Sequence, residues 1–150
     1  MGKRRRARES TIQILFQLEF DDSFPEQIIE GYWQNRKVPK EIVEYGTWLV
    51  KGIINHKDEI DKIVQSVSEH WRISRMAVVD RNILRLAVFE FLYEKDLDQA
   101  IVINEAIEIA KKYSSDQSSM FINGVLDAIK ERLSKPEDNK KDESNGSNQR

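Results

Sequence analysis

Apolar residues recur three and four positions apart along most of this sequence, in long stretches that contain neither Pro nor Gly. Near the start, for example, Ile14, Leu15 and Leu18 fall on one face of a helix. The 150 residues include only three Pro and six Gly, so few positions favour the turns that a β-sheet requires. The pattern predicts an all-α protein whose length suits one domain with its own core.

The pattern divides into about seven helices, which we expect to pack as two helical subdomains. A single long helix over residues 40–67 fits almost as well as two helices with a break near Asn55. Ser23 is expected to cap the second helix, Ser74 to open the fifth, and Ser118 or Ser119 to cap the seventh. The expected helices lie at about residues 7–20, 25–37, 40–54, 58–67, 74–93, 103–113 and 118–133.

The C-terminal segment has a different character. Residues 134–150 show no apolar periodicity, contain Pro136, and carry four basic and four acidic side chains. Such a segment cannot bury enough apolar surface to fold. We therefore expect a helical domain over residues 1–133 and a disordered tail over residues 134–150.

Positive charge is concentrated at the N-terminus. Lys3, Arg4, Arg5, Arg6 and Arg8 place five cations in the first eight residues, although the formal net charge of the chain is −2. Cations at the start of a helix are unfavourable, because the helix N-terminus is already partly positive. The cluster makes sense if it binds an external anion, and its charge density favours nucleic acid. The alternative is a frayed basic arm that only improves solubility.

The residues that enzymes and metal sites require are scarce. Cys is absent, and no phosphate-binding loop, dinucleotide fingerprint or Gly-x-Ser-x-Gly motif occurs. His56 and His70 have no recognisable partner nearby in the sequence. We expect a protein that is not an enzyme and binds no metal or cofactor. No apolar run suits a signal peptide or a membrane span, so we expect the protein in the cytoplasm.

Three features allow both a structural and a functional interpretation. Glu105 and Glu108 could serve acid–base chemistry, but this spacing is typical of a solvated helix face. Phe16 could stack on a nucleic-acid base, but core packing is the simpler explanation. Gly124 interrupts an apolar stripe, which is best explained by the close approach of another helix.

Four segments of the sequence resemble the NusB family. They are RRRARE at residues 4–9 followed by QILF at 13–16, VDRNILRLA at 79–87, INEAIEIAK at 103–111 and FINGVLD at 121–127. Their order and spacing match the family from about residue 3 to residue 133. Together they are a specific signal, whereas each alone is weak.

The resemblance implies two packed helical subdomains and a role in transcription antitermination. It implies binding to boxA-type single-stranded RNA together with NusE, the small-subunit ribosomal protein S ten, in an RNA polymerase elongation complex with other Nus factors. At position 117 some relatives carry an acidic residue. By position, the resemblance places at the NusE interface Asp80, Arg81 and Arg85. It places at the RNA surface Lys3, Arg4, Arg5, Arg6, Arg8, Phe16, Gln117 and Phe121.

Two alternatives remain at this point. One is a stand-alone relative of the N-terminal RNA-binding domain of an rRNA methyltransferase, an enzyme that would need a catalytic domain after the helices. The other is a helical homodimer that serves only as an interaction protein.

Overall fold

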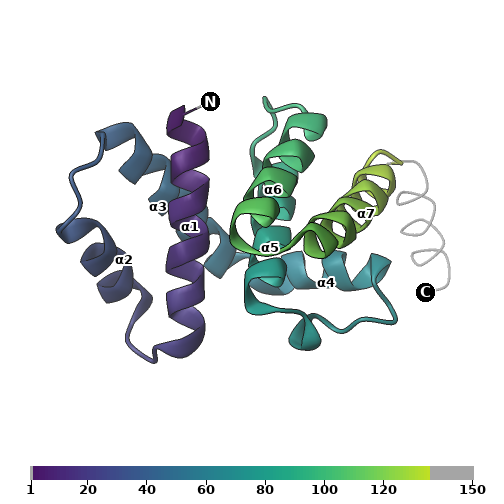
Figure 1. Ribbon diagram of the computed structural model, residues 1–150, viewed down its shortest axis with the longest axis horizontal. Coiled ribbons are helices and arrows are strands. Elements are labelled where there is room, and N and C mark those ends of the chain that lie inside the picture. Colours follow the sequence, from purple (N-terminus) through teal and green to yellow (C-terminus); the bar gives the residue numbers. More distant parts are fainter. Residues whose placement is uncertain (1, 136–150) are drawn as a thin grey trace, which may run out of the picture.

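The structure is a computed structural model that describes residues 2–135, and this range is all-α, as predicted (Figure 1). A short 3₁₀ turn at Ile73–Arg75 precedes α5. The tail predicted for residues 134–150 lies outside the described residues from position 136 onward. The α-helices of the described range are α1 (Gly2–Phe20), α2 (Pro25–Gln34), α3 (Lys40–Asn55), α4 (Lys57–Val67), α5 (Val78–Tyr93), α6 (Gln99–Tyr113) and α7 (Asp116–Leu133).

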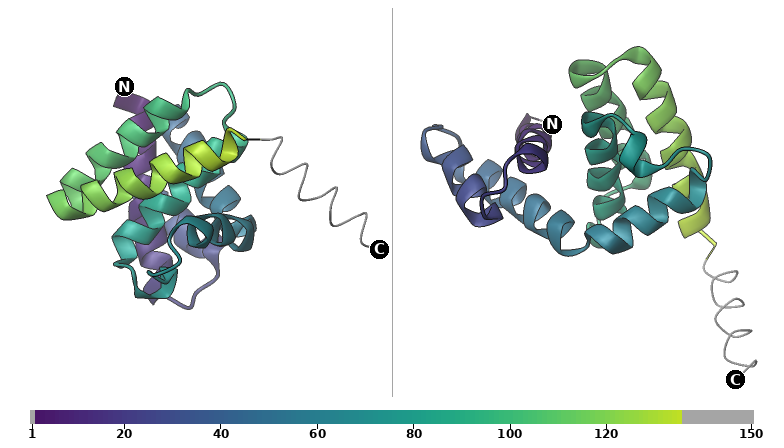
Figure 2. Two further views of the ribbon diagram at one scale, coloured as in Figure 1. Left: turned by 90° about the vertical axis from the view of Figure 1, so that its right-hand side faces the viewer. Right: turned by 90° about the horizontal axis from the view of Figure 1, so that it is seen from below.

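The helices form two groups that meet along α5. One group is α1 with α2 and α3, and the other is α5 with α4, α6 and α7. Contacts of α5 with α1 and α3 join the groups. Figure 2, in its right-hand view, shows the two groups side by side, with α3 and α4 leading from one to the other. This arrangement agrees with the expectation of two packed helical subdomains.

Helix α5 is the centre of the core. Ile83, Leu84 and Val88 are fully buried, and α5 contributes further buried residues on most of its sides. Burying one such side chain contributes roughly 1.5–3 kcal/mol. Gly52 of α3 lets α3 approach α5 closely, because a Cβ there would lie 2.1 Å from the Phe89 ring. This close contact packs α3 against α5.

The break between α3 and α4 is confirmed, since His56 separates two distinct helices. The predicted cap of α2 is wrong. Pro25 occupies the first helical position, so the extended residue before it, Phe24, becomes the N-cap and makes no side-chain capping bond. Ser23 instead donates its amide to Asp21 Oδ1 at 2.9 Å.

Three later helices also begin at other residues than predicted. Helix α5 begins after Ala77 rather than at Ser74, because a 3₁₀ turn uses the intervening residues. Helix α6 begins four residues earlier than expected, where Asp98 accepts a hydrogen bond from the Ala100 amide at 2.8 Å. Helix α7 is capped by Ser115, not by Ser118 or Ser119. Helices α6 and α7 thus begin next to a side chain, Asp98 or Ser115, that satisfies a free amide of the first turn, whereas α5 has no side-chain cap.

The explanation given for Gly124 is wrong. A Cβ at this position would meet no other atom within 4 Å, so no helix approaches it closely. Within residues 2–135, none of the helices combines the length and the apolar character needed to cross a bilayer.

Candidate nucleic-acid interface

All five N-terminal cations lie on a helix, because α1 begins at Gly2 rather than near residue 7. Successive residues of a helix point in directions about 100° apart. The cations therefore divide between the protein interior and its surface. Arg8 is buried, Arg5 is half-buried, and Lys3, Arg4 and Arg6 are exposed.

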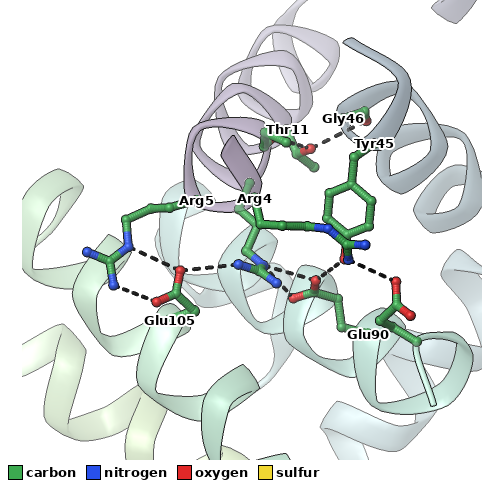
Figure 3. A network of polar contacts seen from close by, with 10 residues as sticks. Arg4, Arg5, Thr11, Tyr45, Gly46, Glu90 and Glu105 are labelled. Atoms are coloured by element: carbon green, nitrogen blue, oxygen red, sulfur yellow. Dashed lines mark hydrogen bonds and ion pairs between the residues drawn. The ribbon is translucent and has the colours of Figure 1, made fainter. Parts of the chain in front are cut away.

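Arg8 forms a buried ion pair. Its Nε donates to both carboxylate oxygens of Glu90 at 3.0 and 2.9 Å, and its Nη1 donates to Glu105 Oε1 at 3.2 Å. Only 4% of the Arg8 side chain and 1% of the Glu90 side chain are exposed. Figure 3 shows this network between α1, α5 and α6. Arg8 therefore joins the two helix groups and offers no free surface to a phosphate.

Arg5 is bound to the same carboxylate cluster. It donates to the two oxygens of Glu105 at 3.1 and 2.5 Å. These hydrogen bonds hold the pKa of the Glu105 carboxyl below its usual range. Glu105 is buried, so the prediction that it belongs to a solvated helix face is wrong. Lys112, at the end of the same helix, pairs with Glu9 of α1 at 2.9 Å.

Arg4 has a fixed orientation although 55% of its side chain is exposed. Its guanidinium lies 3.9 Å from the centre of the Tyr45 ring, and its Nη1 donates to Glu94 at 3.1 Å. Tyr45 in turn donates its hydroxyl to Glu90, as Figure 3 shows. Burial and the charge of Glu90 raise the pKa of the Tyr45 hydroxyl, so it remains a donor.

Lys3 and Arg6 are the most available of the five cations. Lys3 pairs with Glu41 at 3.0 Å, but both side chains are more than half exposed. Such a surface pair contributes about 0–1 kcal/mol and is easily exchanged. Arg6 is exposed, and none of the acidic side chains in residues 2–135 forms an ion pair with it.

Phe16 lies on the surface of α1, so the simpler prediction of core packing is wrong. Its exposed fraction is 44%, and its ring centre lies 5.0 Å from that of Phe20. Neighbouring positions Ile14 and Leu15 fill the core instead. The exposed face of α1 therefore carries cations in its first half and aromatic rings in its second half.

The end of α6 lies against this helix and positions the start of α7. The Tyr113 hydroxyl donates to Glu9 at 2.9 Å, and Gln13 contacts the same hydroxyl at 3.4 Å. Gln117, in the first turn of α7, is exposed. Phe121 is half-buried and packs against the core, so only part of its ring faces solvent.

The residues expected at a partner interface make internal contacts. Asp80 is 8% exposed, and its carboxylate accepts hydrogen bonds from Ser114 at 2.9 Å and Ser118 at 2.8 Å. It lies in the first turn of α5 and connects α5 to the turn before α7. Its charge is therefore used within the chain.

Arg81 and Arg85 extend these contacts to other helices. Arg81 donates to Glu19 of α1 at 3.2 and 2.8 Å, and Arg85 donates to Asp61 of α4 at 2.8 and 3.1 Å. Burial opposes ionisation of Glu19, but the bonds from Arg81 and Arg85 prevail and lower the pKa of its carboxyl. Of the two arginines, Arg81 is the more exposed.

Sequence reasoning missed the internal partners of the basic cluster. Glu90 is the one charged residue between Leu86 and Tyr93 in the apolar sequence of α5, and this isolation signals a buried ion pair. Glu105 gave a weaker signal, because Asn104 and Glu108 lie close to it in the sequence. Residues 2–135 contain no group of His, Asp and Glu side chains that could hold a metal ion.

Comparison with known proteins identifies the family. The model of the NusB family matches residues 5–131. The chain belongs to the NusB family. It is 42% identical over 137 residues to the transcription antitermination protein NusB of Desulfatibacillum aliphaticivorans, with 91% of this chain and 96% of that protein covered. Relatives of this family are thus named for transcription antitermination, in agreement with the non-enzymatic role expected from the sequence.

Solved NusB-family structures share the fold. T. maritima NusB matches with a TM-score of 0.77 and 41% identity, covering 84% of this chain and 89% of that chain. A crystal structure of the antitermination factors NusB and NusE in complex with dsRNA matches with a TM-score of 0.76 and 31% identity. That alignment covers 86% of this chain and 96% of the other. The family predicted from four sequence segments is therefore confirmed.

Proposed function

We propose that this chain is a transcription antitermination factor that binds boxA-type RNA together with NusE and joins the RNA polymerase elongation complex in the cytoplasm. Its family and the solved complex of NusB and NusE with dsRNA support this function. The observation that carries it in this chain is the exposed face of α1, where Arg6 and Phe16 lie on one helix. Cations that contact phosphates and rings that stack on bases are the usual elements of single-strand binding.

The N-terminal cations then have two different roles. Lys3, Arg4 and Arg6 contact RNA phosphates, and Arg4 does so by exchanging its bond to Glu94. Arg5 and Arg8 hold α1 against α5 and α6 through Glu90 and Glu105. This division departs from the equal RNA-binding roles expected from the sequence, because buried carboxylates already pair with two of the five cations.

The start of α7 completes the proposed RNA surface. Gln117 is exposed there as a neutral hydrogen-bonding group, and the exposed part of Phe121 offers a ring edge or face to a base. Phe121 also packs against the core. A Phe121 substitution is therefore expected to affect both RNA binding and stability.

The NusE surface is proposed around the start of α5. The family resemblance assigns to it Asp80, Arg81 and Arg85. Their hydrogen bonds to other helices and turns of the chain fix the shape of this surface. Arg81 has the more exposed side chain of the two arginines and is the better candidate for direct contact. Asp80 acts through the orientation of the turn that it holds.

The proposed function is tested by gel shift with boxA-type RNA and a scrambled RNA of equal length, with and without NusE. Arg6→Ala is expected to weaken boxA binding and to reduce the log–log salt slope by about 0.7, the value for one phosphate of a single strand. Arg132→Ala, an exposed cation in the last turn of α7, is the matched control. Equal binding of the wild-type chain to boxA and scrambled RNA in the presence of NusE would refute the proposal.

A further inference from the structure

A groove of about 660 Å³ lies between the second half of α1 and α2. Phe16, Gln17 and Phe20 line it from α1, and Tyr32 with Arg36 line it from α2 and the residues that follow. None of these residues belongs to the basic cluster at the start of the chain. The groove combines aromatic rings, an amide and a guanidinium, which is the chemistry that binds a nucleotide.

The two phenylalanine rings form an open stacking surface. Their centres are 5.0 Å apart with the planes inclined by 54°, and Phe20 is 70% exposed. An exposed pair of rings gains little by contact with water, and every nucleobase has a face that can stack on such a ring. Gln17 is exposed beside them and makes no side-chain hydrogen bond within residues 2–135, so its amide is available to a base edge.

Arg36 supplies the positive charge of the groove. Its guanidinium lies 3.8 Å from the centre of the Tyr32 ring, and its Nη1 donates to the Tyr32 carbonyl oxygen. Across the described range it forms no ion pair with a carboxylate, so its remaining donors can bind a phosphate. Asp21 borders the groove, but its Oδ1 already accepts the Ser23 amide.

The groove continues the proposed RNA surface of α1. Arg6, Gln13, Gln17 and Phe20 are seven, four and three residues apart, so they follow one face of the helix. All four are exposed. Fourteen residues of helix span about 21 Å from Arg6 to Phe20. RNA that contacts Arg6 and stacks on Phe16 reaches the groove by following the same helix face.

We propose that the groove between α1 and α2 binds a further nucleotide of the same single-stranded RNA. Its base stacks on Phe20 beside Phe16, Gln17 contacts the base edge, and Arg36 binds the adjoining phosphate. This site rests on the proposed RNA-binding function and extends it beyond the basic N-terminus and α7. A protein partner is the less suitable occupant, because the lining combines polar and aromatic groups with a guanidinium that forms no ion pair within residues 2–135.

The test compares Phe20→Ala and Arg36→Gln with two matched controls that do not line the groove. Phe24→Ala removes an equally exposed ring, and Lys37→Gln removes an adjacent exposed cation. Affinity is measured with boxA-type RNA and with the same RNA shortened one nucleotide at a time from either end. Melting curves monitor the fold, and light scattering monitors self-association.

We expect Phe20→Ala to weaken binding of the full RNA about tenfold, the effect of losing one stacked base. For the shortened RNA that lacks the nucleotide in the groove, Phe20→Ala and the wild type should have equal affinities. Arg36→Gln should reduce the salt slope by about 0.7. Both controls should bind as the wild type does, and every variant should melt at the wild-type temperature.

Different failures have different meanings. If the wild type binds boxA RNA and Phe20→Ala binds each RNA with the same affinity as the wild type, the groove is not a nucleotide site and the proposed function stands. If Phe20→Ala changes self-association or NusE binding but not RNA affinity, the groove is a protein contact and the inference is wrong. If the wild type binds no RNA, the proposed function and the groove site both fail.

Discussion

Arg8→Met separates a structural cation from an RNA-binding cation. Arg8 has the same charge and lies in the same short segment as Arg6, yet its side chain is 4% exposed and pairs with Glu90 inside the protein. Methionine keeps much of the length of the side chain and removes the guanidinium. The substitution leaves the Glu90 carboxylate buried, and within residues 2–135 the Tyr45 hydroxyl is then its one remaining side-chain donor.

The expected cost is large. Removing one member of a buried ion pair destabilises a protein by about 3–5 kcal/mol, because the remaining charge is uncompensated. For a domain of this size each kcal/mol lowers the melting temperature by about 2–4 °C, so a decrease of about 10 °C is expected. Burial already raises the pKa of the Glu90 carboxyl, and loss of Arg8 raises it further. The penalty should therefore shrink as the pH falls and Glu90 takes up a proton.

Urea unfolding followed by circular dichroism measures the free energy of each variant. Arg8→Met combined with Glu90→Gln should recover most of the loss, since the glutamine carries no charge and still accepts a bond from Tyr45. Arg6→Met is the matched control and should unfold at the wild-type midpoint while binding RNA more weakly. If Arg8→Met unfolds like the wild type and loses as much RNA affinity as Arg6→Met, the assignment of a structural role to Arg8 and an RNA-binding role to Arg6 is wrong.

Four further predictions concern single residues. Asp80→Ala should lower the free energy of unfolding by about 1.5–3 kcal/mol in urea titrations, because its carboxylate accepts two hydroxyl hydrogen bonds. The folded pKa of Glu105 lies below its ordinary value of 4.5, so its stabilisation is complete above that value and should disappear as the pH falls below it, as thermal melts at several pH values would show. Gly124→Ala should raise stability by up to about 1 kcal/mol in the exposed interior of α7. Gly52→Ala should lower stability, because its Cβ would collide with the Phe89 ring; equal stabilities for the two glycine variants would contradict this packing.

The helices themselves could be predicted because their signal is local. The repeat of apolar residues marks α5 as the central helix, and Asn55 with Asp58 marks the break between α3 and α4. Helix starts were predicted less well. Several Ser and Asp residues near each start can cap a helix, and the turn before it decides which residue does so.

The number of charged residues at the site could be predicted from the sequence, but not which of them face the interior and which face solvent. Arg8 and Glu90 are 82 positions apart, and no local pattern relates them. Their pairing depends on how α1 packs against α5, which is a property of the fold. The same holds for Phe16, since its position on α1 fits either the core or the surface until the neighbouring helices are placed.

The RNA-binding claim is tested most directly by the affinity of the wild-type chain for boxA-type RNA, measured in the presence and absence of NusE against a scrambled RNA of equal length. We expect binding that prefers boxA, that NusE strengthens, and that Arg6→Ala weakens with no change in the melting temperature. The proposed role of this helix face would be contradicted if the affinity were the same for boxA and scrambled RNA and did not change with NusE. It would also be contradicted if Arg6→Ala left the affinity unchanged.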